Sequence, residues 1–186
     1  MRGTYARARV VVVRGAFART LIWVGVVGTL AGLLEPTMTG RRRGGLIGIG
    51  LFVLAALLGL LLRRRWYARR AREAGKAAFA VTLEPPHETR VRMARMNAWW
   101  LLGGAAATCA LGLVAGSAAG MLVLGYGVGL QVACLLLARW ERRQEMLLWA
   151  RTEDGRLLGR RSRISDFAFT GPAAGNVRPV VRAARR

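Results

Sequence analysis

The residues of this chain best suited to catalysis or metal binding are three polar side chains beside a proline pair. Glu84 precedes Pro85 and Pro86, and His87 and Glu88 follow them. A histidine flanked by carboxylates can transfer protons or ligate a metal ion. The spacing matches no metal-ligand motif, HExxH is absent, and His87 is the single histidine of the chain. The sequence therefore predicts a solvated loop here, in a protein that is not an enzyme and holds no metal or cofactor.

Two other kinds of chemically interesting side chain lie within apolar stretches. Gln131 is the strongest polar group at depth, where it could bind a transported solute or form a hydrogen bond between helices. We favour the hydrogen bond, because transporters usually carry ionisable groups at that depth and these stretches have none at their centres. Cys109 and Cys134 would differ in depth by about 10 Å on neighbouring antiparallel helices, too far for a disulfide. We interpret both as small packing residues.

Positive charge is the dominant chemical feature of the chain. Its 30 Lys and Arg exceed its 9 Asp and Glu, which gives a formal charge of +21. Such an excess favours binding to phosphates, either of nucleic acid or of anionic lipid headgroups. The candidate polyanion-binding residues follow the second apolar stretch or lie near the C-terminus: Arg63, Arg64, Arg65, Arg69, Arg72, Lys76, Arg160, Arg161 and Arg163.

The apolar residues occupy different stretches from most of the charges. They make up 54% of the chain and form four runs, at 17–34, 44–62, 98–116 and 118–138, in which Arg19 is the one charge. A membrane-spanning helix needs about 20 such residues, and these runs are apolar all round, whereas a soluble helix has a polar face. The sequence therefore predicts an all-α, polytopic integral membrane protein with four transmembrane helices over 17–138. The first run follows a basic leader at 1–16 and precedes no cleavage site, which predicts an uncleaved signal anchor.

The distribution of basic residues between loops predicts the orientation. With both termini in the cytoplasm, 27 Lys and Arg face the cytoplasm and 3 face outward, and basic loops favour the cytoplasmic side. The three outward arginines, at 41–43, are interpreted as headgroup anchors rather than as a ligand site. The expected location is the inner (cytoplasmic) membrane. Four tryptophans at the predicted inner borders fit an aromatic belt: Trp66, Trp99, Trp100 and Trp140.

Glycines recur at four-residue spacing inside the predicted spans. Small residues four apart let helices approach closely, which matters where lipid is as apolar as leucine. They could pack the four helices into one bundle, which we favour, or pack the spans of two chains into a homo-oligomer. The sequence leaves both open. The pairs are Gly28 with Gly32, Gly112 with Gly116, and Gly125 with Gly129.

The cytoplasmic segments are predicted to be helical near the membrane. The loop at 63–97 begins as a continuation of the second span, with a ridge of basic residues on one face that runs from Arg65 to Lys76. Tyr67 and alanines form the opposite face, which suits packing against another helix. Thr89 is expected to cap a short return helix. The fourth span is predicted to continue as a helix to Trp149, and the rest of 139–186 to be a flexible basic tail.

These features predict a non-enzymatic accessory or scaffold protein of the membrane. Its polybasic cytoplasmic face would bind anionic phospholipid and dock a larger protein complex. Non-specific nucleic-acid binding is the first alternative, and a small transporter or channel subunit is the second. In size, number of spans and charge, the chain resembles the small membrane proteins that accompany DNA translocases on conjugative plasmids. That profile implies a plasmid-transfer or pore component under the first alternative.

Overall fold

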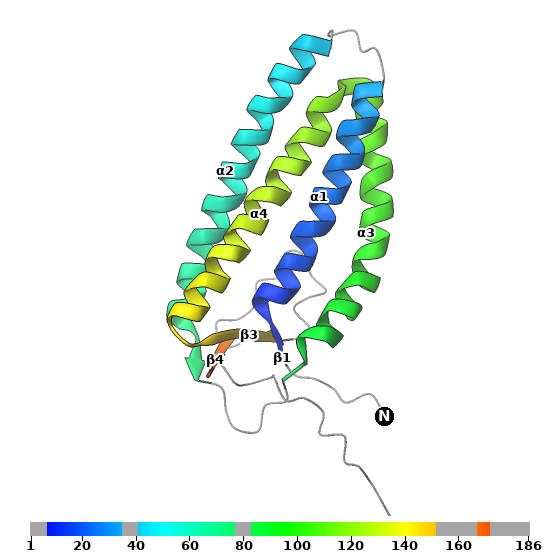
Figure 1. Ribbon diagram of the computed structural model, residues 1–186. Coiled ribbons are helices and arrows are strands. Elements are labelled where there is room, and N and C mark those ends of the chain that lie inside the picture. The colour runs from blue at the N-terminus through cyan, green and yellow to red at the C-terminus, as the bar shows by residue number, and fades with distance from the viewer. Residues whose placement is uncertain (1–6, 35–40, 77–82, 152–166, 172–186) are drawn as a thin grey trace, which may run out of the picture.

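The described part of the chain folds into four long helices with a small sheet across one end (Figure 1). The computed structural model describes residues 7–34, 41–76, 83–151 and 167–171. Within them the elements follow in the order β1 (Arg7–Arg9), α1 (Val10–Leu34), α2 (Arg41–Glu73), β2 (Gly75–Lys76), α3 (Pro86–Ala115), α4 (Ser117–Arg143), β3 (Leu147–Arg151) and β4 (Phe167–Thr170). The prediction of a mainly helical chain is confirmed.

Three of the helices are long and apolar enough to cross a membrane. They comprise Val10–Leu34, Gly45–Arg69 and Ser117–Arg143. Their outward surfaces are apolar: Leu54 of α2 is 64% exposed and Leu135 of α4 is 56% exposed. Because exposed leucines in such number are unfavourable in water and favourable in hydrocarbon, these surfaces fit a multi-pass membrane protein. The third predicted run, 98–116, coincides with the second half of α3.

The four helices pack within one chain, as favoured from the sequence, and they form an open layer. α1 and α4 pack against each other at the centre, α2 packs against α4, and α3 packs mainly against α1. The order across the layer is therefore α2, α4, α1, α3, as Figure 1 shows from left to right. α2 has no extensive contact with α1 or α3. It is held in the layer by a single neighbouring helix.

Glycines make the contact between α2 and α4 possible. A Cβ atom at Gly125 would collide with the backbone carbonyl oxygen of Phe52, and one at Gly129 with that of Ala56. The two helix backbones therefore touch directly along this pair, as small residues allow.

The other four predicted glycines lie where α1 meets the α3–α4 hairpin. A Cβ at Gly28 would come within 2.7 Å of the Thr108 side chain, and one at Gly32 would collide with the backbone of Gly116. Gly112 lies against the backbones of Gly28 and Gly32. The structure thus places all six predicted glycines at helix contacts within one chain.

Strands close the end of the layer at which α1 begins and α4 ends. The sheet has the order β1-β3-β4-β2, with β3 antiparallel to both β1 and β4, and β2 parallel to β4. The register places Ala8 opposite Ala150, and Leu148 opposite Phe169. Since directly paired residues share a face, Leu148, Ala150 and Phe169 point to the same side of the sheet.

This side of the sheet packs on the helix ends. Its residues join a buried cluster with Val10 of α1, Tyr67 of α2, Leu137 of α4 and Phe167 of β4. The all-α prediction is therefore wrong in this part of the chain. The helix does not continue to Trp149 and the tail is not flexible throughout, because β3 and β4 are strands within it.

The end of α4 shows why the helical prediction failed. α4 ends at Arg143, Gln144 is its C-cap, and Glu145 has a positive φ of 49°. The Met146 N–H donates to the Glu141 carbonyl oxygen at 3.1 Å, which closes the turn into β3. A left-handed residue at 145 turns the chain back toward the sheet, and a glutamate there gives no sequence signal for it.

Candidate anion-binding end of the helical layer

Exposed arginines gather at the sheet end of the layer. They lie on α2 as it leaves its apolar stretch, on the first turns of α3 and on the last turns of α4: Arg64, Arg65, Arg69, Arg90, Arg95, Arg139, Arg142 and Arg143. Arg19 lies further along α1, and its Nε donates to the Gly15 carbonyl oxygen at 3.2 Å, one turn nearer to the sheet. The arrangement is a positive band around one end of the helices, and it is suited to phosphates.

The predicted polyanion-binding residues differ in exposure, and some lie outside the described residues. Arg64, Arg65 and Arg69 are exposed within the band, and Arg63 is half-buried. The predicted ridge does not reach Lys76, because α2 ends at Glu73 and Lys76 lies in β2. The backbone of Arg72 belongs to α2, and its side chain lies outside the described residues. So do Arg160, Arg161 and Arg163.

A buried carboxylate joins the sheet to the last helix. Glu141 of α4 is 1% exposed. One of its oxygens accepts a 2.7 Å hydrogen bond from Arg9 of β1, and the other accepts the Leu148 backbone N–H of β3 at 3.1 Å. The Arg9–Glu141 ion pair therefore holds the first strand, the third strand and the fourth helix together.

A second ion pair replaces the predicted solvated loop. Glu84 is buried and accepts a 2.6 Å hydrogen bond from Arg92, and its backbone N–H donates to the Arg7 carbonyl oxygen at 2.9 Å. Exposed His87 lies in the first turn of α3. The described residues hold no group of three or more His, Cys, Asp or Glu that could bind a metal ion.

Thr89 is not the cap of α3. Pro85 occupies the N-cap position and Pro86 the first turn, and the Thr89 hydroxyl donates back to the Pro85 carbonyl oxygen at 3.3 Å. Proline suits the first helical turn because its missing N–H would have no partner there. The return helix and the third apolar run are therefore one continuous helix.

Two of the four tryptophans predicted at the membrane border pack against the sheet. Trp99 and Trp100 of α3 are exposed, as an aromatic belt requires. Trp66 of α2 packs edge-on against Phe167 with 5.6 Å between ring centroids, and Trp140 of α4 packs against Phe169 at 5.9 Å. Trp66 and Trp140 thus form part of the layer on which the sheet rests.

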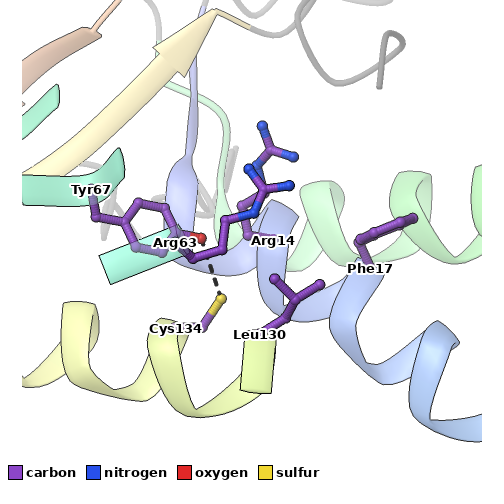
Figure 2. Close-up of a pocket in the computed structure, with 6 residues that line it drawn as sticks. All are labelled: Arg14, Phe17, Arg63, Tyr67, Leu130 and Cys134. Carbon is purple, nitrogen blue, oxygen red and sulfur yellow. Dashed lines mark hydrogen bonds between the residues drawn. The ribbon is translucent and has the colours of Figure 1, made fainter. Parts of the chain in front are cut away.

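A small pocket lies just inside this end, where α1, α2 and α4 meet (Figure 2). It has room for about one water molecule. At its floor the Tyr67 hydroxyl and the Cys134 sulfur are 3.6 Å apart and share a hydrogen bond. Its lining residues are Arg14, Phe17, Arg63, Tyr67, Leu130 and Cys134.

The predicted polar and sulfur-bearing groups of the helices do not form a common site. Cys109 and Cys134 are both free thiols. The Gln131 side-chain oxygen is buried and has no hydrogen-bond partner among the described residues, so the expected interhelical hydrogen bond through that oxygen is absent there.

No family model, curated protein or solved structure matches this chain. Its candidate function therefore depends on the geometry of the arginine-rich end alone.

Sequence reasoning missed the residues that shape this end most. The sequence predicts Arg14 in the basic leader, Tyr67 on a helix-packing face, and Glu141 in the helical continuation of the fourth span. One signal was available: Leu147–Arg151 and Phe167–Thr170 are short runs rich in apolar and aromatic residues, as strands are.

Proposed function

We propose that this protein is a non-enzymatic accessory or scaffold protein of the inner membrane, whose arginine band binds anionic phospholipid and whose cytoplasmic end docks a partner complex. The observation that carries the proposal is the collection of exposed arginines at the one end where the apolar surfaces of the helices stop. At that level the phosphates of lipid headgroups are the abundant anions, and each basic group near an anionic leaflet contributes about 1 kcal/mol.

The proposed topology has four spans and both termini in the cytoplasm. α3 lies in the same layer as the three apolar helices and packs along α1, and its exposed Trp99, Leu102 and Leu111 fit lipid contact. A helix in that position crosses the membrane with its neighbours. The arginine-rich sheet end then faces the cytoplasm, in accord with the preference of basic residues for that side.

Cysteine labelling tests this topology. In a background with C109A and C134A, we expect Thr39→Cys to react with a membrane-impermeant maleimide in intact cells. His87→Cys, at the exposed start of α3, should react only after the membrane is permeabilised. Labelling of position 87 in intact cells would contradict the orientation, and labelling of both positions from the same side would contradict an odd number of crossings between them.

Lipid and nucleic acid compete for the same arginines under this proposal. Both present phosphates, but the arginines of the band lie about one turn from the apolar surfaces of the same helices, so lipid headgroups reach them without any further element. Double-stranded nucleic acid usually requires a groove-reading element or an extended positive surface. The arginine band is such a positive surface, so the preference for lipid rests on its position beside the apolar surfaces of the helices.

A competition experiment tests the preference. Detergent-purified protein is titrated with labelled duplex DNA over a salt series, and nanodiscs of anionic or zwitterionic lipid are then offered as competitors. We expect weak DNA binding with a steep salt dependence that disappears with anionic nanodiscs and persists with zwitterionic ones. DNA binding that persists against anionic lipid would overturn the lipid proposal in favour of nucleic-acid handling.

A further inference from the structure

The pocket between α1, α2 and α4 contains two arginines that have no acidic partner among the described residues. Arg14 and Arg63 are both half-buried, and their guanidinium groups both point away from Cys134 and Leu130 in Figure 2. Each lies over the Trp66 ring, at 5.5 and 5.9 Å from its centroid. Both cations therefore contact the same aromatic ring.

Two other half-buried arginines, unlike this pair, each have a carboxylate partner. Arg9 has the carboxylate of Glu141 at 2.7 Å, and Arg92 has that of Glu84 at 2.6 Å. Among the described residues no carboxylate lies within 4 Å of Arg14 or Arg63. Two adjacent positive charges that are partly removed from water repel each other, and an anion between them would remove that cost.

The pair lies between the sheet end and the apolar stretch of the helices. Tyr67 lies one turn beyond Arg63, toward the sheet, whereas Phe17 lies one turn beyond Arg14, toward the centre of the apolar stretch. Leu130 is likewise one turn nearer to that centre than Cys134. A ligand that fits this position has an anionic group beside the two cations and an apolar part beside Phe17 and Leu130.

We propose that Arg14 and Arg63 form a specific site for one phosphate group of an anionic phospholipid. The planar guanidinium groups of two arginines match the oxygens of a phosphate. The phosphate lies at the mouth of the pocket, because the interior of the pocket has room for about one water molecule. Phe17 and Leu130 border the site on the side where an acyl chain begins. This inference rests on the proposed membrane function, but it differs from binding by the arginine band because it predicts one defined lipid.

Lipid titration followed by native mass spectrometry tests the site. The purified protein is titrated with phosphatidylglycerol or phosphatidylcholine, and the affinity of the first bound lipid is measured. We expect phosphatidylglycerol to bind more tightly, and Arg14→Gln and Arg63→Gln each to weaken it about tenfold, the usual cost of a lost hydrogen bond to a charged group. Arg64→Gln is the matched comparison: it removes the same charge from the next, exposed position of α2, within the arginine band, and should lower the affinity of the first bound lipid by a smaller factor than Arg63→Gln does.

The outcomes separate this inference from the proposed function. Equal losses in R63Q and R64Q, or no loss in either, would overturn the specific site while the preference for anionic lipid stood. An equal affinity of the wild-type protein for both lipids would contradict the proposed function as well. Displacement of phosphatidylglycerol by inorganic phosphate at the same concentration would assign the site to a soluble phosphate compound and overturn the lipid assignment.

A conservative variant distinguishes a loss of lipid binding from a loss of folding. Should R63Q lower the thermal midpoint of unfolding, Arg63→Lys keeps the charge and most of the aliphatic stem but cannot bind a phosphate in bidentate fashion. We expect R63K to keep the wild-type midpoint and to weaken phosphatidylglycerol binding severalfold. Wild-type affinity in R63K together with a loss in R63Q would show that a positive charge at position 63 is sufficient for phosphatidylglycerol binding. It would overturn the proposal that two guanidinium groups hold the phosphate.

Discussion

Replacing Glu141 with glutamine is expected to destabilise the sheet end by about 3 kcal/mol, the usual cost of breaking a buried ion pair. The substitution preserves the size of the side chain but removes the charge that faces Arg9, whose side chain is 26% exposed beside a fully buried carboxylate. The amide also has one accepting oxygen where the carboxylate has two. Either the Arg9 guanidinium or the Leu148 N–H therefore loses its partner.

The expected result is a local opening of the sheet rather than loss of the helical layer. Limited proteolysis of the protein in nanodiscs should cleave E141Q between α4 and β4 faster than the wild type, while the helical circular dichroism signal remains. Glu145→Gln is the control, because Glu145 is exposed two residues beyond the end of the same helix. Equal cleavage rates in E141Q and the wild type would show that the ion pair contributes little to holding the strands.

Adding two methyl groups to the contact between α2 and α4 is expected to separate these helices. In the double variant G125A/G129A each new Cβ meets a backbone carbonyl oxygen of α2, and a backbone cannot rotate aside as a side chain can. Overpacking of this kind costs about 1–3 kcal/mol per site. Because α2 has no other extensive helical neighbour, this overpacking weakens the one helix contact that stabilises the position of α2.

The distance between the two helices provides the measurement. Spin labels at Leu46→Cys on α2 and Leu122→Cys on α4, both exposed positions, should move apart by about 1 Å or more, since carbon atoms pack at about 3.5–4 Å. The thermal midpoint should fall as well. Gly50→Ala on α2 is the control, because a Cβ there meets nothing within 4 Å. An unchanged label distance in G125A/G129A would mean that the direct backbone contact is absent.

The helical part of the fold was predictable because each helix is determined by its own residues. Uninterrupted apolar runs and the glycines at four-residue spacing need no knowledge of the partner helix. The open order of the layer was not predictable, because the same glycines fit a closed bundle. Which neighbour Gly125 faces depends on the packing of all four helices together.

The sheet end was not predictable for a different reason. β1 and β2 contain three and two residues, and strands that short exist only because β3 and β4 lie beside them. Arg14 and Arg63 are far apart in sequence, and their meeting over Trp66 follows from the way α1 and α2 both flank α4. Pairings of this kind arise from tertiary structure and leave no local pattern.

The pairing of the first strand with the third has a consequence for biosynthesis. Arg9 and its partner Glu141 are separated by 132 positions, so the ribosome must add that many residues before the ion pair can form. At about 5–20 residues per second, this takes on the order of ten seconds. Throughout that interval the N-terminal strand has no pairing partner from β3. The sheet therefore forms late, after α4 has been synthesised. A nascent chain arrested before β3 would carry an unpaired strand that a chaperone or protease could recognise.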